Sequence, residues 1–222
     1  MTQVLHSCNY ISSELKKRQL LLPFVANQMI RLLIGNESGK PMFKGNAAIL
    51  FSDIRAFTTI SEDHEPEEVV TMLNEYFELW NSAVEKYGGV IEKFIGDAVV
   101  AVFFENFDPH YTQNCLQSGI EVMNTLQTFN RERSKQNRFE IKIGIGIDEG
   151  EIDLTIVGSQ RKKHLLINSS KMKVAEELEA QTRNCSQTHI LVSETVKARL
   201  EELYDFSPHL LENSTAYELQ KS

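Results

Sequence analysis

Two apolar runs meet at a glycine–aspartate pair in the stretch VIEKFIGDAVVAVF, Val90–Phe103. Short apolar runs on both sides of a two-residue turn predict a β-hairpin. Its strands are expected at Val90–Ile95 and Ala98–Phe103, with Gly96 and Asp97 in the turn. Asp97 therefore leads directly into the second strand of the hairpin.

The segments on either side of this hairpin complete a β-α-β-β-α-β order. Apolar side chains at helical spacing predict the helices, and short or alternating apolar runs predict the strands. This order is that of the ferredoxin-like fold, an α+β class in which helices cover one face of an antiparallel sheet. The flanking elements are a strand at Ala47–Ser52, a helix at Glu67–Tyr87, a helix at Tyr111–Gln136 and a strand at Phe139–Ile147. The first of these helices is expected to bury Val69, Val70, Leu73, Phe77, Trp80 and Val84.

Two further segments flank this core. Before it, Ile11–Leu33 has a helical apolar pattern that Pro23 should bend, and Ile34–Asn46 is a loop rich in glycine and asparagine. We therefore expect an N-terminal helical segment and loop over residues 1–44 and a second domain over residues 45–222. The C-terminal extension is expected to contain strands at Glu151–Val157, His189–Val192 and Ala216–Gln220 and helices at Lys171–Gln181 and Glu194–Leu203.

The composition excludes several classes of protein. The 222 residues include 41% hydrophobic residues, which argues against disorder, and carry a net charge of −8, which argues against binding a nucleic-acid backbone. No apolar run approaches the roughly 20 residues that span a bilayer, and Met1–Cys8 does not resemble a signal peptide. The odd number of cysteines, three, indicates free thiols. We expect a cytoplasmic protein with no membrane span.

Two aspartates are brought together by the expected topology. Asp53 follows the first strand and Asp97 begins the third, and these strands are antiparallel neighbours in a ferredoxin-like sheet. Two carboxylates at one sheet edge repel each other unless a cation compensates them, and Mg²⁺ or Mn²⁺ suits oxygen ligands. Taken singly, however, Asp53 could cap a turn and Asp97 could be an ordinary hairpin residue, so spacing and topology leave both interpretations open.

Three segments resemble the catalytic domain of class III adenylyl and guanylyl cyclases. They are FSDIRAFT at Phe51–Thr58, EKFIGDAV at Glu92–Val99 and IGIGI at Ile143–Ile147. The resemblance covers about residues 45–220. It implies an enzyme that converts a nucleoside triphosphate into a 3′,5′-cyclic monophosphate and pyrophosphate. It also implies a homodimer whose active sites form between the two subunits.

The resemblance assigns roles to individual positions. Asp53, Asp97 and the Ile54 carbonyl would bind two Mn²⁺ or Mg²⁺ ions per site. Lys93 would reach the nucleobase. The turn Ile54–Thr58 would hold the phosphates. The further substrate-binding candidates in and near these turns are Arg55, Phe57, Thr58 and Gly96.

The second half of the chain departs from the family. Where the family has Gly-Asp, Asn and Arg, this chain has Ser169-Ser170, Lys173 and Glu177, and the base-selecting position is Leu166. Lys173 could supply a positive charge in place of the missing Asn and Arg, or it could form a solvated helix-surface pair with Glu177.

These departures leave three interpretations. The altered base-reading half looks like that of the bacterial pyrimidine cyclases of Pycsar anti-phage defence. That likeness implies cyclic UMP or cyclic CMP as a second messenger, read by a separate effector protein. The alternatives are a cyclase-like domain that binds nucleotide with little or no turnover, and an adenylate cyclase with an atypical base pocket.

Overall fold

The computed structural model describes residues 42–158, 163–211 and 214–221. The chain divides into two compact units, of which the second spans Lys44–Ser222. The helical segment expected at Ile11–Leu33 lies outside the described residues, and the domain boundary after residue 44 stays a prediction.

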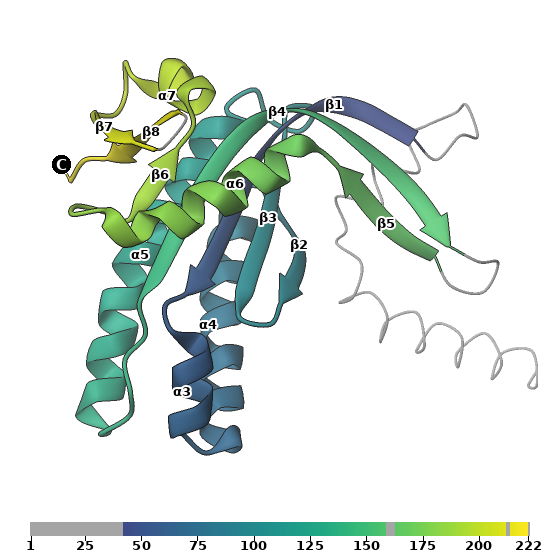
Figure 1. Cartoon of the computed structure of the whole chain (residues 1–222). Coiled ribbons are helices and arrows are strands. Elements are labelled where there is room, and N and C mark those ends of the chain that lie inside the picture. Colours follow the sequence, from purple (N-terminus) through teal and green to yellow (C-terminus); the bar gives the residue numbers. More distant parts are fainter. Residues whose placement is uncertain (1–41, 159–162, 212–213, 222) are drawn as a thin grey trace, which may run out of the picture. The chain divides into compact units, whose positions relative to one another are not determined.

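The described residues form a mixed α+β domain around one eight-stranded sheet, shown in Figure 1. The strands follow the order β2-β3-β1-β4-β6-β8-β7, and β5 pairs with β4 outside this path. The strands are β1 (Met42–Ile54), β2 (Val90–Ile95), β3 (Ala98–Phe104), β4 (Ile143–Gly158), β5 (Lys163–Asn168), β6 (Ile190–Val192), β7 (Phe206–Leu210) and β8 (Thr215–Leu219). The helices are α3 (Phe57–Asp63), α4 (Pro66–Lys86), α5 (Tyr111–Lys135), α6 (Ser170–Gln181), the 3₁₀ turn η2 (Thr182–Asn184) and α7 (Glu194–Leu200).

The predicted ferredoxin-like core is confirmed. β1, α4, β2, β3, α5 and β4 follow one another in the expected order, with the short helix α3 inserted after β1. β3 pairs antiparallel with both β1 and β2. In the hairpin, Ile95 pairs with Ala98 across the turn, and Gly96 adopts a φ of 63°, a conformation that glycine reaches without strain.

Helices cover both faces of the sheet, whereas the sequence predicts helices on one face. Ile145 packs against α5, where it lies beside Gly119. The next residue, Gly146, points to the other face, and a Cβ there would collide with the backbone of Ala175 and Glu179 in α6. Figure 1 shows α6 crossing the near face of the sheet, with α4 and α5 behind it. The glycines of the Ile-Gly-Ile-Gly-Ile strand therefore let α6 approach closely.

Helix α4 buries most of the expected apolar face. Of the six residues expected inside, Val69, Trp80 and Val84 are buried, and Leu73 and Phe77 pack partly buried against the core. The prediction is wrong for Val70, which is 55% exposed. The helix also buries Met72, Tyr76 and Ala83, which the apolar pattern did not include.

Several predicted strand boundaries are wrong. β1 begins at Met42 rather than Ala47, inside the expected loop. The strand expected from Phe139 begins only at Ile143, because the Asn130 side chain binds both the N–H (3.0 Å) and the carbonyl (2.7 Å) of Ile141. The two strands expected at Phe139–Ile147 and Glu151–Val157 form one strand, β4, which continues through Gly150 at a φ of 152°.

Two smaller expectations can also be compared with the structure. Cys115 and Cys185 are buried free thiols, as predicted, while Cys8 lies outside the described residues. Within the described part of the chain, no helix is both long enough and apolar enough to cross a membrane.

Two strands of the structure, β5 and β7, were not predicted from the sequence.

Candidate functional site

The ends of β1 and β3 bring Asp53 and Asp97 together. Ser52 pairs with Val99 in the antiparallel register, so the next residues outward on the two strands meet at the sheet edge. The backbone N–H of Ile54 donates to Asp53 Oδ1 and to Asp97 Oδ2, each at 3.1 Å. The two carboxylates therefore converge on one amide, as the strand topology predicts.

This arrangement leaves negative charge uncompensated. Burial raises the pKa of Asp97, and a hydrogen bond and charge repulsion from Asp53 act in the same direction. Together they bring the pKa to about 7. One shared amide dipole is too weak to offset two carboxylates. A divalent cation fits because it supplies the missing positive charge and takes oxygen ligands.

The pair offers few protein ligands. In the part of the chain that the structure describes, no group of three or more Asp, Glu, His or Cys residues could hold a metal ion. A cation bound by Asp53 and Asp97 would thus keep open positions. Such positions suit Mg²⁺ or Mn²⁺, which commonly complete their coordination with water or phosphate oxygens.

A buried hydroxyl pair lies beneath the two carboxylates. Tyr76 Oη on α4 is 3.4 Å from Ser52 Oγ on β1, and both residues are fully buried. Burial raises the pKa of Tyr76 far above its usual value, and the charges of Asp53 and Asp97 act in the same direction. Tyr76 therefore stays neutral and links α4 to the strand that carries Asp53. The sequence analysis missed this residue because a tyrosine on an amphipathic helix is usually a packing residue.

The turn expected to hold phosphates is present after β1. Ala56 adopts a left-handed conformation with a φ of 55°, and α3 begins at Phe57. Phe57 packs partly buried against the core, and Thr58 is exposed. Gly96, the other candidate near this edge, is exposed in the hairpin turn.

The Arg55 side chain, which was expected to contact the substrate, binds other residues of the chain instead. Its guanidinium donates to Glu179 Oε1 at 2.8 Å and to the hydroxyl of Thr182, so the side chain is bound to the end of α6. Glu179 is 4% exposed, and burial raises its pKa to about 7 although Arg55 opposes the shift. The geometry thus favours a structural role for Arg55, as the link between the strand end that carries Asp53 and helix α6.

Lys93 lies at an irregularity in β2. The register between β2 and β3 shifts between Ile91 and Lys93, which is typical of a β-bulge at Glu92. The Lys93 ammonium pairs with Glu92 at 3.1 Å, and its side chain is 40% exposed. The Glu92 side chain is only 7% exposed, so Lys93 compensates a largely buried carboxylate, and its ammonium would have to leave this partner to reach a ligand.

Lys173 and Leu166 do not lie on the strands that carry Asp53 and Asp97. Lys173 and Glu177 form an exposed ion pair at 3.4 Å on the surface of α6, with side chains 78% and 63% exposed. This is the helix-surface pair that the sequence analysis kept as an alternative. Leu166, on β5, pairs with Thr155 and is 45% exposed.

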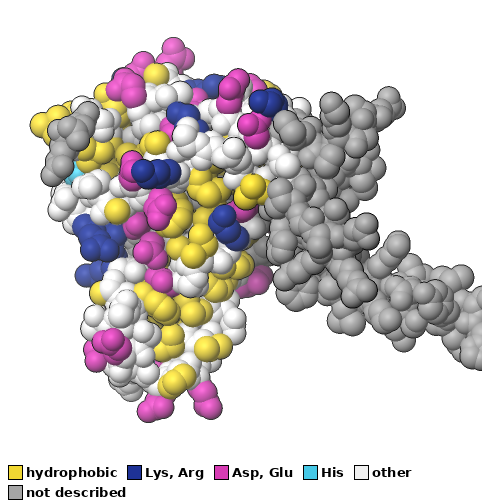
Figure 2. Space-filling view, turned by 45° about the vertical axis from the view of Figure 1, so that its right-hand side comes forward, with side chains coloured by type: hydrophobic (Ala, Val, Ile, Leu, Met, Phe, Trp, Pro, Cys, Tyr) yellow, Lys and Arg dark blue, Asp and Glu magenta, His cyan; other side chains and the backbone are white. Residues whose placement is uncertain are grey.

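Hydrophobic side chains gather on one face of the domain. Figure 2 shows them as a band down the middle of the view, with charged side chains on both sides. The exposed large hydrophobic residues include Phe94 and Ile95, which immediately precede the Gly96-Asp97 turn. Leu166 belongs to the same class. Apolar residues this close to a polar site are typical of an interaction surface.

The adenylate and guanylate cyclase catalytic domain family matches residues 41–215. The chain belongs to this family. It is a class III cyclase catalytic domain, and that class consists of lyases that form cyclic nucleotides. The sequence resemblance at Phe51–Thr58 and Glu92–Val99 is thereby confirmed at the level of the family.

Curated relatives of this cyclase domain are longer proteins. An adenylate cyclase of Anabaena cylindrica is 34% identical over 170 residues, which cover 75% of this chain and 33% of the relative. Adenylate cyclase 1 of Rhizobium meliloti is 29% identical over 188 residues, covering 83% and 28%. The chain thus spans about a third of the length of these relatives.

Solved cyclase structures share the fold. A bacterial light-regulated adenylyl cyclase superposes with a TM-score of 0.86 at 23% identity, covering 100% of this chain and 66% of the other. The adenylyl cyclase CyaB of P. aeruginosa gives a TM-score of 0.72 at 23% identity, covering 82% and 96%. These similarities confirm the α+β architecture of the cyclase domain.

Proposed function

We propose that this domain converts a nucleoside triphosphate into a 3′,5′-cyclic monophosphate and pyrophosphate, with two Mn²⁺ or Mg²⁺ ions per site. The observation that carries the proposal is the convergence of Asp53 and Asp97 on the Ile54 amide. The Ile54 carbonyl is proposed as a further metal ligand. Divalent ions bound there would make the ribose 3′-hydroxyl more acidic and offset the charge of the phosphates.

The residues of the chain contribute mainly position and charge. Asp53 and Asp97 would hold the cations, and the turn Ile54–Thr58 with Gly96 would lie near the phosphates. Tyr76 fixes the strand end from below through Ser52. The 3′-oxygen attacks the α-phosphorus, its proton passes to solvent, and pyrophosphate leaves with the electron pair of the broken P–O bond. Such phosphoryl transfers depend on positioning rather than on covalent catalysis by the protein.

We propose a homodimer with shared sites. Lys93, Leu166 and Lys173 are the candidates for base and transition-state contacts, and the latter two lie on β5 and α6 rather than beside the carboxylate pair. The exposed Phe94 and Ile95 support a dimer face next to Asp97. A second copy would then complete each site by presenting its own Leu166 and Lys173 to the metal pair.

We propose a pyrimidine substrate, UTP or CTP. Leu166 is an exposed aliphatic side chain at the base-selecting position, so it cannot make the hydrogen bonds that distinguish adenine from guanine. The named relatives are adenylate and guanylate cyclases, which makes a purine substrate the competing possibility. The proposal includes cyclic UMP or cyclic CMP as a second messenger for a separate effector in anti-phage defence.

A four-nucleotide assay tests this function. Purified protein with Mn²⁺ or Mg²⁺ is incubated with ATP, GTP, CTP and UTP separately, and the products are resolved by mass. We expect a cyclic pyrimidine product, and Asp53→Ala and Asp97→Ala should each abolish it. A purine product would support the adenylate cyclase alternative.

One observation favours a second candidate function, a nucleotide-binding domain with little turnover. Lys173 already has a partner, Glu177, on the surface of α6, so Lys173 itself does not offer a free cation in place of the family's Arg in this conformation. The absence of any cyclic product in the four-nucleotide assay, together with metal-dependent nucleotide binding, would establish this alternative.

A further inference from the structure

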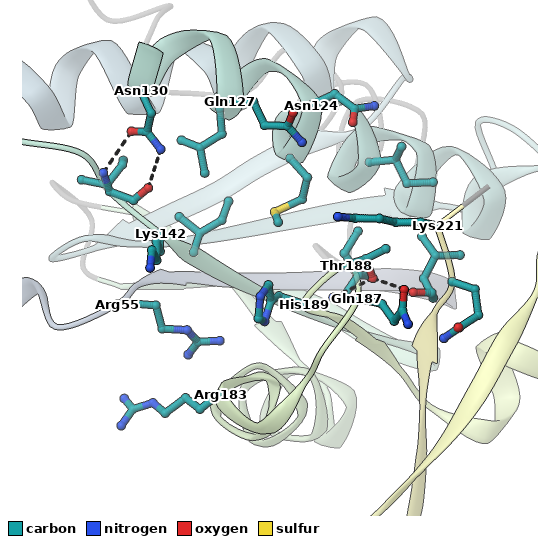
Figure 3. A pocket seen from close by; sticks show the side chains of 18 of the residues that line it. Arg55, Asn124, Gln127, Asn130, Lys142, Arg183, Gln187, Thr188, His189 and Lys221 are labelled. Carbon is teal, nitrogen blue, oxygen red and sulfur yellow. Dashed lines mark hydrogen bonds between the residues drawn. The ribbon is translucent and has the colours of Figure 1, made fainter. Parts of the chain in front are cut away.

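We propose that a cavity of about 840 Å³ between α5, the start of β4 and the C-terminal strands binds a small amphipathic organic anion, with an anionic head on an apolar body. Figure 3 shows this cavity from close by. Its volume falls within the range of about 300–1,000 Å³ that is typical of ligand pockets. The lining contains neither Asp53 nor Asp97, so the cavity is separate from the metal pair.

The charged side chains that line the cavity are of one sign. Among the residues that the structure describes, its lining includes four basic side chains and no Asp or Glu, although the chain carries a net charge of −8. These side chains are Arg55, Lys142, Arg183 and Lys221. In the view of Figure 3, the first three lie toward one end of the cavity and Lys221 toward the other. Concentrated positive charge in a concave site attracts an anion.

Most of this charge is available. Arg55 is bound to Glu179, whose charge Arg183 also attracts, but Lys142, Arg183 and Lys221 form no ion pair within the part of the chain that the structure describes. The backbone of Lys142 is nevertheless fixed, because its carbonyl accepts from the N–H of Arg55 at 2.7 Å. The cationic end of the cavity therefore combines free ammonium and guanidinium groups with an anchored backbone.

The floor of the cavity is apolar. Its lining includes the partly buried side chains of Ile120, Met123 and Tyr204, together with core residues such as Ile143 and Leu219 that are almost fully buried. A simple inorganic anion would leave this surface exposed to water, whereas an organic anion would cover it with its apolar body.

The loop between η2 and β6 is fixed before any ligand binds. The buried carboxylate of Glu218 accepts four backbone N–H groups, from Ser186, Gln187, Thr188 and His189, at 2.8–3.3 Å. Burial alone would raise the pKa of Glu218, but these hydrogen bonds together hold it below its usual value. The carboxylate thus remains charged and holds the loop against the cavity.

The same loop presents polar groups to the cavity. His189 adopts a φ of 56°, an uncommon conformation for a residue other than glycine, and its ring Nδ1 lies 3.1 Å from the Thr182 carbonyl. Since a carbonyl only accepts, Nδ1 is the donor, and Nε2 of the neutral ring is an acceptor that can take a donor group of the ligand rather than its anionic head. Strained backbone that the surroundings hold in place is typical of binding sites.

A titration with anilinonaphthalene sulfonate tests the proposal, since this probe joins an aromatic body to an anionic group. The measurement is made in EDTA on the full chain, so it needs neither turnover nor metal and is independent of the proposed cyclase activity. We expect saturable fluorescence with one site per chain. The uncharged N-phenylnaphthylamine, which has the same ring system, should bind at least about tenfold more weakly, because it lacks the group that the cations recognise.

Charge reversal of the cationic end identifies the site. Lys142→Glu with Arg183→Glu should weaken sulfonate binding at least about tenfold, and the milder pair Lys142→Gln with Arg183→Gln should weaken it less. Arg131→Glu is the matched control, because Arg131 is an exposed α5 residue outside the cavity lining, and its affinity should stay within about twofold of the parent. Unchanged affinity in both pairs, equal binding of the uncharged probe, or the lack of a saturable site would each overturn the proposal.

Discussion

At the scale of single residues, the burial of Asp97 beside Asp53 has a consequence for stability. Because the pKa of Asp97 is raised to about 7 in the folded protein, the folded state binds a proton that the unfolded chain releases near its usual pKa of 3.8. This contribution to stability is therefore fully present below that usual pKa. It is lost as the pH rises through about 7.

We expect the metal-free protein to show this dependence relative to Asp97→Asn. The wild-type chain should lose stability against the variant between about pH 4 and pH 7, and Mn²⁺ should restore the wild type only. Thermal unfolding in EDTA and with added Mn²⁺ measures both effects. Parallel pH profiles for the two proteins, or equal stabilisation by Mn²⁺, would contradict the assigned electrostatics.

The ion pair between Arg55 and Glu179 gives a second prediction at this scale. Arg55→Ala would leave the Glu179 carboxylate, which is 4% exposed, without its partner. We expect a loss of about 3 kcal/mol in the free energy of unfolding, since breaking a buried pair from one side is costly. The double variant with Glu179→Gln should recover part of this loss. Chemical denaturation of the four proteins forms the cycle, and additive losses would show that the two residues do not interact.

At the scale of elements, the glycines of β4 explain how α6 packs on the sheet. A Cβ at Gly146 would collide with backbone atoms of α6, which cannot move independently of the helix. We expect Gly146→Ala to destabilise the domain by about 1–3 kcal/mol and to displace α6. Gly119→Ala is the matched control, because the nearest atom, Ile145 Cδ1, would lie at an ordinary 3.4 Å and alanine favours the helix. Equal stability of the two variants would exclude close packing as the reason for Gly146.

The helices and strands also show how much of the fold the sequence predicts. The hairpin at Gly96-Asp97 and the meeting of Asp53 with Asp97 follow from local turn chemistry and strand order, and both were predicted. The strand start at Ile143 was not predicted, because the side chain of Asn130, eleven residues before Ile141, takes the hydrogen bonds of that residue.

The roles of Arg55 and α6 could not be predicted from the sequence for a similar reason. An arginine two residues after a proposed metal ligand favours a substrate contact unless its partner is known. Here the partners are Glu179 and Thr182, which lie far along the chain and meet Arg55 only through the packing of α6 on β4. Tertiary contacts of this kind leave no periodic pattern to find.

At the scale of the whole molecule, shared active sites predict complementation between inactive variants. In the proposed dimer, one subunit supplies Asp53 and Asp97 and the other supplies Lys173. Asp53→Ala and Lys173→Ala are therefore expected to be inactive or weak alone. After subunit exchange in an equal mixture, half of the dimers should combine the two variants and retain one intact site, giving about a quarter of the wild-type activity.

The control mixture contains Asp53→Ala and Asp97→Ala, which disable the same half of the site and cannot complement each other. Cyclic nucleotide formation is measured for each variant and for both mixtures after exchange at low protein concentration. Recovery in the first mixture alone requires that a site draws on two subunits, because no single chain in it carries both halves. Recovery in neither mixture, with exchange verified by mass, would mean that each chain contains its own complete site, and then Lys173 would have to act beside Asp53 within one subunit.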